Sequence, residues 1–383
     1  MEVDEKSDGK RITVTFECET ITPMFLRGAD GRTPELRAPS IKGAIRYWWR
    51  SLQDSTQTKS LLEREINLFG GTGSSGKKSP VSIRVISKLN DSSIGHNLWD
   101  ELDKETPPGK TYYRSKSGSR GIHYLFYSVL PMNTRLDGPY IKSGSEFSVI
   151  LSAYEQEPLQ EASIAFMFLS IFGGLGSRVR RGAGSFDIIK VESTNITSEL
   201  DNILIACLIS KRLKNHEGVC GFLRDIIESN IVDTCTNLNT VNSFKEVSLY
   251  VFRPQKSWKE AMDKIGVYYM NFRNRNKGRI EETPNFGFPI RHKNGTTMMA
   301  GMDMGEKQKP SLLRRRASPI VIKVIRDNNG NYYPMMIWFK SRLLPGEYQI
   351  MDEDGGNKMI ETPGIIQEFI NSIPVKEYEE VRL

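Results

Sequence analysis

Strict alternation of apolar and polar residues marks the first element of the chain. In RITVTFECETIT, residues 11–22, Ile12, Val14, Phe16 and Cys18 alternate with polar residues, chiefly threonine and glutamate. Successive side chains of a strand point to opposite faces of a sheet. The pattern therefore predicts a strand buried on one face.

After this strand, apolar residues recur at the spacing of a helix. In PSIKGAIRYWWRSL, residues 39–52, Ile41, Ile45, Trp48 and Leu52 recur at the spacing of one helix face, which predicts a buried helix stripe. Pro39-Ser40 is expected to form its N-cap. A second helical stretch is expected to end at NLFGG, residues 67–71.

The remaining elements of the first half complete a β-α-β-β-α-β unit. We expect a helix at about 159–172, and strands at 79–87, 121–130, 145–153 and 185–191. This order is that of a ferredoxin-like, or RRM-like, unit. Residues 88–120 are expected to form a polar insertion.

The second half has a weaker pattern. It predicts helices near 199–213 and 257–272, a strand at 246–253, and a hairpin over 317–340 that turns at 328–331, where asparagine and glycine suit positive φ. The predicted fold class is α+β, with two tandem ferredoxin-like (βαββαβ) modules that carry insertions. We place the first module at residues 1–193 and the second, degenerate one at 194–383.

Composition narrows the class of protein. The 383 residues suit two domains. The net charge of +7 is compatible with nucleic acid or anionic lipid. No secretory signal and no membrane span is recognised, and the four cysteines form no CxxC pair. We therefore expect a cytoplasmic protein with no disulfide framework, no structural zinc, no bound metal and no cofactor.

GGLGSRVRRGAGSF, residues 173–186, contains five glycines, three arginines and no acidic residue. It fails as a dinucleotide loop because Val179 replaces the third glycine and a strand follows. It fails as a domain linker because it joins a core helix to an apolar strand. Glycines let backbone N–H groups face an anion, and arginines suit phosphate oxygens. Solvated surface arginines remain the alternative.

A second glycine-rich stretch, GGTGSSGKKS at residues 70–79, fits G-x-x-x-x-G-K. Lys78 stands where a P-loop needs serine or threonine for magnesium. A helix is expected before it and a strand after it, which reverses the order of a P-loop. We interpret this stretch as a mobile basic loop.

Topology predicts which basic segments meet. In a β-α-β-β-α-β unit the fourth strand lies beside the first and antiparallel to it, so residues 21–40 should lie near 173–184. This brings Arg27, Arg37, Lys42 and Arg46 toward the glycine-rich loop at a helix N-terminus, which itself favours anions. The insertion between the second and third strands opens at the same edge. Trp49 could stack on a base there, with ordinary packing as the alternative.

Catalytic motifs are scarce. The four histidines are isolated, with no HxxxH pair and no G-x-S-x-G. His123 could serve general acid–base cleavage of RNA, and Asp30 could bind a metal. The simpler interpretations are an ordinary surface or core histidine and a turn-forming Asp-Gly pair.

These segments resemble the RAMP superfamily of CRISPR effector proteins, and above all its two-module members in the type III-B Cmr complex. The resemblance rests on residues 20–52, on LFG at 68–70, on the glycine-rich loop, and on RASPIVIKV (316–324) with the downstream LLPG (343–346). The C-terminal half matches more weakly.

The resemblance implies a non-catalytic, RNA-binding subunit of a ribonucleoprotein. Its expected partners are the CRISPR guide RNA, the target RNA and other Cmr subunits, with no membrane. Other RAMP subunits cut target RNA with an Asp in the loop after the first strand, so an endoribonuclease acting through Asp30 or His123 stays the alternative. The expected RNA-binding residues are Arg27, Arg37, Lys42, Arg46, Trp49, Arg50, Arg114, Lys116, Arg120, Gly174, Gly176, Arg178, Arg180, Arg181, Gly182 and Gly184.

Overall fold

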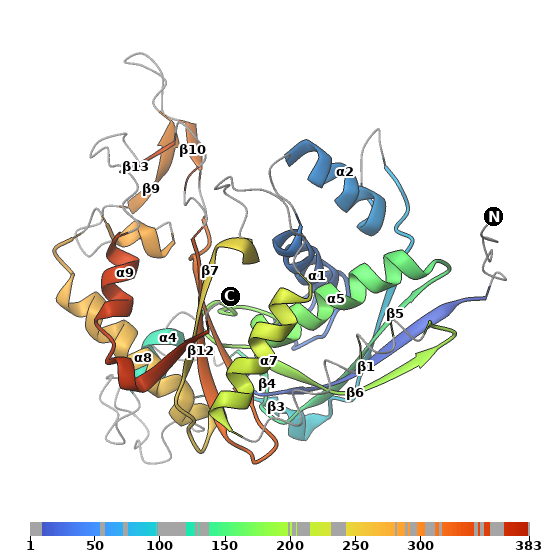
Figure 1. Ribbon diagram of the computed structural model, residues 1–383, viewed down its shortest axis with the longest axis horizontal. Helices are drawn as coiled ribbons and strands as arrows, with labels where there is room; N and C mark the ends of the chain where they lie inside the picture. Colours follow the sequence, from blue (N-terminus) through green and yellow to red (C-terminus); the bar gives the residue numbers. More distant parts are fainter. Residues whose placement is uncertain are drawn as a thin grey trace.

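The structure is a computed structural model of the chain (Figure 1). It describes residues 10–381 apart from the internal segments 54–57, 72–75, 97, 99–119, 127–128, 130–137, 198–199, 201–203, 205–214, 231–242, 280–281, 288–289, 292–296, 303–310, 314–315, 341–343, 345–347 and 353–363.

The first half builds a four-stranded antiparallel sheet with strand order β2-β5-β1-β6. Counted along the chain, these strands are second, third, first and fourth, and helices α1 and α5 pack against each other beside the sheet (Figure 1). The predicted alternation is present, since every second residue of β1 is buried. The elements are β1 (Ile12–Thr20), α1 (Ala38–Leu52), α2 (Thr58–Phe69), β2 (Ser82–Ser87), β5 (Glu146–Ala153), α5 (Gln156–Phe172) and β6 (Phe186–Thr194).

The second half repeats this strand order. Its antiparallel sheet runs β11-β12-β7-β14, which is again second, third, first and fourth along the chain. The predicted hairpin turns where expected, with Gly330 at φ 78°. The elements are β7 (Val247–Phe252), α8 (Trp258–Arg275), β11 (Ile320–Arg326), β12 (Tyr332–Phe339), α9 (Gly364–Asn371) and β14 (Tyr378–Val381). The α+β class and the antiparallel sheets are confirmed.

Further elements lie between these strands. A small antiparallel sheet stands apart from the two larger ones in Figure 1 and consists of β8 (Ile290–Arg291), β9 (Thr297–Met302), β10 (Ser311–Leu313) and β13 (Gln349–Asp352). Two short strands, β3 (Ile94–Gly95) and β4 (Tyr140–Ile141), pair in the insertion of the first half. Helix α7 (His216–Glu228) joins the halves. No described helix has both the length and the apolar character that a membrane span needs.

Apolar packing crosses from one half to the other. The ring of Trp48 on α1 lies 5.8 Å from that of Phe244 and 6.3 Å from that of Phe339. Residues of α1, α5, α7, β7 and β12 therefore share one buried cluster. The core that supports the first sheet is not independent of the second half.

One predicted strand is wrong. Residues expected to form a strand at 121–130 instead begin with helix α4 (Arg120–Phe126). Ile122, Leu125 and Phe126 recur at helical spacing and are buried, and α4 packs on α8 of the other half. The carboxylate of Asp263 accepts hydrogen bonds from the first amides of α4, at 2.8 Å from Gly121 N. A tertiary capping contact thus selects the helix.

Other differences are smaller. The N-cap of α1 is Arg37, not Pro39-Ser40, because Pro39 already occupies the first turn, where its missing N–H costs nothing. Helices α7 and α9 and strand β14 had no sequence prediction. The predicted helix at 199–213 lies almost entirely outside the described residues.

Candidate nucleic-acid interface

The loop after β1 and the glycine-rich loop are hydrogen-bonded to each other. Gly184 N donates to Pro23 O at 2.8 Å, and Ser177 N donates to Phe25 O at 2.9 Å. The hydroxyl of Thr22 donates to Gly182 O at 2.7 Å. The prediction that residues 21–40 lie against residues 173–184 is confirmed, because the antiparallel β1–β6 pair holds both loops at one sheet edge.

Both loops line a shallow groove that opens beside the first turns of α1. Its volume is about 400 Å³. Its floor is mostly apolar or backbone, which suits an extended ligand better than a compact one. The lining residues are Phe25, Leu26, Arg27, Ser40, Ala44, Gly174, Leu175, Gly176, Ser177 and Val179.

One cation, Arg27, lines this groove, while Arg37 directly precedes α1 and Lys42 lies on the first turns of α1. Arg27 is exposed, and among the described residues its one hydrogen bond is a long one, of 3.3 Å, to Gly31 O. Arg37 is half-exposed, with its Nε 3.9 Å from Glu35 Oε2. Lys42 lies on α1 and is half-buried. The first turn of α1 carries no acidic residue and its N-cap side chain makes no capping bond, so the helix dipole adds to the positive field.

The surroundings of Lys42 disfavour the charged form of its side chain. Burial and then the neighbouring Arg46 lower the pKa of its ammonium group. Among the residues that the structure describes, none forms an ion pair with Lys42. An anion bound beside Lys42 would relieve this repulsion.

Arg46 and Arg50 are tied to the protein instead. Both donate at 2.6 Å to one oxygen of Glu65, whose side chain is only 4% exposed. A buried carboxylate needs such cations, because an unpaired buried charge is costly. Their first role is to anchor α2 to α1, although about a third of each arginine side chain remains exposed.

The arginines of the glycine-rich loop also have internal partners. Arg178 Nε donates to Leu125 O at 3.0 Å, and Arg180 donates to Ser318 O at 2.5 Å while lying over the ring of Tyr47. Arg181 donates to Tyr269 Oη at 2.8 Å and lies 4.7 Å from that ring's centre. Arg180 and Arg181 therefore connect the loop to the second half, and Arg178 connects it to α4 of the first half. No sequence signal indicated these partners, because they lie far away along the chain.

The glycines of this loop are required by the protein's own packing. A Cβ on Gly174 would lie 2.7 Å from Gly184 O, and one on Gly176 would lie 2.6 Å from Phe25 O. Gly176, Gly182 and Gly184 all have positive φ. Of these glycines, Gly174 and Gly176 line the groove, whereas Gly182 and Gly184 do not.

The structure contradicts the prediction that Trp49 could stack on a base. Its side chain is 1% exposed, and its indole Nε1 donates to Glu161 at 2.6 Å. A ring enclosed in this way cannot stack on a base. The ordinary-packing alternative was right, and the helix face interpreted as cationic is partly core.

The basic residues of the insertion cannot be placed relative to the groove. Arg114 and Lys116 lie outside the described residues, and Arg120 begins α4 but its side chain is not described. In the 70–79 stretch, helix α2 precedes and strand β2 follows. This is the order that argues against a P-loop, as expected.

Neither candidate catalytic residue has a catalytic arrangement. Asp30 is exposed, and its carboxylate accepts bonds from Arg32 N, Thr33 N and Thr33 Oγ1. The Thr33 hydroxyl and these amides lower the pKa of Asp30 to about 2. This is the turn-forming interpretation. His123 is 7% exposed on α4 and lies within electrostatic range of Asp263 on α8, so it is a core histidine and not a surface one.

Comparison with known proteins identifies the family. The model of the RAMP superfamily matches residues 17–187. The CRISPR system Cmr subunit Cmr1-2 of Pyrococcus furiosus is 31% identical over 188 residues, which cover 45% of this chain and 93% of that protein. The chain belongs to the RAMP superfamily.

Other relatives of this RAMP protein extend over both halves. Cmr1-1 of Pyrococcus furiosus is 26% identical over 340 residues, which cover 86% of this chain and 88% of that subunit. The crystal structure of apo Cmr1 from the same organism has a TM-score of 0.59 at 21% identity, covering 96% of this chain and 98% of that one. A chain in a cryo-EM structure of the type III-B Cmr-beta complex bound to cognate target RNA and AMPPnP gives 0.61 at 14% identity, covering 95% and 99%. These likenesses extend the shared fold to the second half.

Proposed function

We propose that this RAMP protein is a non-catalytic, RNA-binding subunit of a type III-B CRISPR effector complex. The groove between the two loops at the start of α1 contacts the phosphate backbone of guide RNA, target RNA or both. The observation that carries the proposal is the basic surface around the start of α1, where Arg27 lines the groove and the half-buried Lys42 beside Arg46 has no ion-pair partner among the described residues. A phosphate oxygen supplies the missing negative charge.

The relatives support this assignment. Two are Cmr subunits by name, and a similar chain belongs to a Cmr-beta complex bound to cognate target RNA. Other Cmr subunits are accordingly the expected protein partners. The repeated strand order of the two large sheets supports tandem ferredoxin-like modules, with their boundary between residues 193 and 194.

Three basic residues in the groove or next to it in sequence define a direct test. Arg27, Arg37 and Lys42 are replaced together by alanine, and the affinity of the full chain for single-stranded RNA is measured from low to high salt. Removing one phosphate contact flattens the log–log salt slope by about 0.7. We expect a clear loss of affinity at low salt and a slope flattened by about 1–2.

A matched control distinguishes the loss of contacts at the groove from the loss of overall positive charge. Arg84, Lys256 and Lys376 are exposed, so their replacement by alanine removes the same charge from other surfaces. We expect this control to keep the wild-type slope. Equal losses in both triple variants, or no loss in the groove variant, would contradict the assignment of the groove.

The non-catalytic part of the proposal has its own test. The purified chain is incubated with single-stranded RNA, once with magnesium and once with chelator. We expect intact RNA in both. Cleavage that disappears in Asp30→Ala or His123→Ala would establish the endoribonuclease alternative, although neither residue has the geometry for it.

A further inference from the structure

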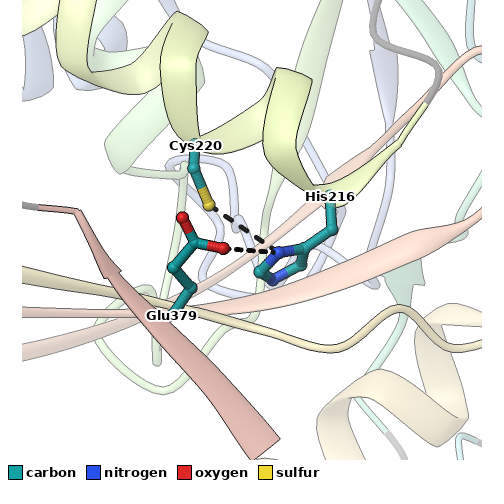
Figure 2. A group of neighbouring side chains, drawn as sticks. All are labelled: His216, Cys220 and Glu379. Carbon is teal, nitrogen blue, oxygen red and sulfur yellow. Dashed lines mark hydrogen bonds and ion pairs between the residues drawn. The ribbon is translucent and has the colours of Figure 1, made fainter.

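A histidine, a cysteine and a glutamate meet away from the groove (Figure 2). His216 and Cys220 are one helical turn apart on α7, and Glu379 lies on β14. One ligand atom from each of the three lies within 4.8 Å of the others. No sequence pattern indicated this cluster, because its third member comes from the far end of the chain.

The two distances from the histidine nitrogen are close to those of a tetrahedral zinc site. His216 Nδ1 lies 3.2 Å from Glu379 Oε2 and 3.9 Å from Cys220 Sγ. With ordinary zinc–ligand bonds, the edges of a tetrahedron measure about 3.4 Å for nitrogen to oxygen and about 3.6 Å for nitrogen to sulfur. Imidazole, thiolate and carboxylate together favour zinc over magnesium or calcium, which prefer oxygen ligands.

The histidine is oriented as a metal ligand would be. Its Nε2 lies 3.0 Å from Val251 O, so that nitrogen donates its proton to the carbonyl and Nδ1 faces the cluster. Metal-binding histidines are typically held in this way by a backbone carbonyl or a carboxylate. Val251 on β7 is also the residue paired with Glu379 in the sheet, so one position of β7 supports both ligands.

The same geometry argues against a catalytic triad. In a cysteine–histidine–acid triad the thiol and the carboxylate contact opposite ring nitrogens, whereas here both lie at Nδ1.

We propose that His216, Cys220 and Glu379 bind a zinc ion that links α7 to β14. Solvent supplies the fourth ligand, because the Glu379 side chain is 43% exposed while that of His216 is 10% exposed. The ion fixes the last strand of the second sheet against the helix that joins the two halves. This site is separate from the RNA groove and does not depend on the proposed function. It also revises the sequence-based expectation that the chain holds no structural zinc.

The test measures metal binding by the full chain. The protein is stripped with chelator, dialysed against zinc and measured by elemental analysis. Cobalt is then substituted to record the thiolate-to-cobalt charge-transfer absorption in the near ultraviolet. We expect about one zinc per chain, a cobalt spectrum with a thiolate band, and a higher melting temperature with zinc than without.

Variants assign the ligands. Glu379→Gln changes a half-exposed side chain and tests the site even if Cys220→Ser or His216→Gln fails to fold. We expect each to weaken zinc affinity at least about tenfold, and Cys220→Ser to abolish the thiolate band. Glu380→Gln, at the next position of β14, and Cys207→Ser, which removes another thiol, should bind zinc normally. Substoichiometric zinc, or binding that Glu379→Gln leaves unchanged, would overturn the proposal and leave a histidine–glutamate ion pair.

Discussion

Single arginines and lysines of this protein divide into those that hold the fold and those that face solvent. Arg181 has a tyrosine hydroxyl and a tyrosine ring as partners, while Arg27 has one weak backbone contact. The sequence places both in basic loops and cannot separate them, because the partners of Arg181 come from the other half. Charge alone therefore selected residues of both kinds.

Lys323 shows how burial controls a single charge. It is fully buried on β11, and its ammonium group donates to Phe186 O at 3.0 Å. Burial lowers its pKa to about 7, against 10.5 for an exposed lysine. The unfolded chain therefore binds more protons than the folded protein between these two values, so stability should rise with pH across that window.

The prediction for Lys323 compares the pH dependence of stability in the wild type and in the Lys323→Met variant. Between pH 7 and 9, the unfolding free energy of the wild type should rise relative to Lys323→Met by up to about 1.4 kcal/mol per pH unit. Urea unfolding at several pH values measures the difference. Parallel profiles for the two proteins would mean that Lys323 keeps its proton and that the explanation by burial is wrong.

At the scale of elements, the glycine-rich loop is a tightly packed connection. The order of strands and helices in the first half predicted that it meets the loop after β1, and hydrogen bonds between the loops confirm this. The sequence did not predict that the loop also joins the second sheet. Ile322 N on β11 donates to Arg180 O at 3.2 Å, and Arg181 forms a β-bridge with Ile322. The loop thereby protects an edge strand that would otherwise be open.

Gly184 provides the test at this scale. It has φ 65°, and a Cβ there would lie 1.9 Å from Leu175 O. Gly184→Ala should lower the unfolding free energy by about 2–4 kcal/mol. Gly43→Ala on α1 meets no atom within 4 Å and should stabilise by up to about 1 kcal/mol. Denaturant unfolding compares them, and similar small effects would contradict a packed loop.

Elements with a clear period were predicted, and those selected by distant contacts were not. The alternation of β1 and the stripe of α1 are local signals. By contrast, α4 forms in a stretch predicted as a strand because Asp263 on α8 caps it. The apolar residues of α4 fit a short helix as well as a strand, so local pattern alone could not decide.

At the scale of the whole molecule, an ion pair and a shared apolar cluster join the two halves. The Arg326 guanidinium on β11 forms two bonds, of 2.8 and 3.0 Å, with the Glu19 carboxylate on β1. The apolar cluster around Trp48 contains residues from both halves. The groove beside α1 therefore rests on a core to which described residues of both halves contribute.

The most direct test of the central claim is a map of RNA–protein crosslinks in the assembled complex. The RNA is crosslinked at zero length, and the modified peptides are identified by mass spectrometry. We predict crosslinks to peptides that contain Phe25 to Lys42 and Gly174 to Val179, and their loss when Arg27, Arg37 and Lys42 are replaced by alanine. Crosslinks confined to other surfaces of this subunit, with both groove peptides unmodified, would contradict the account.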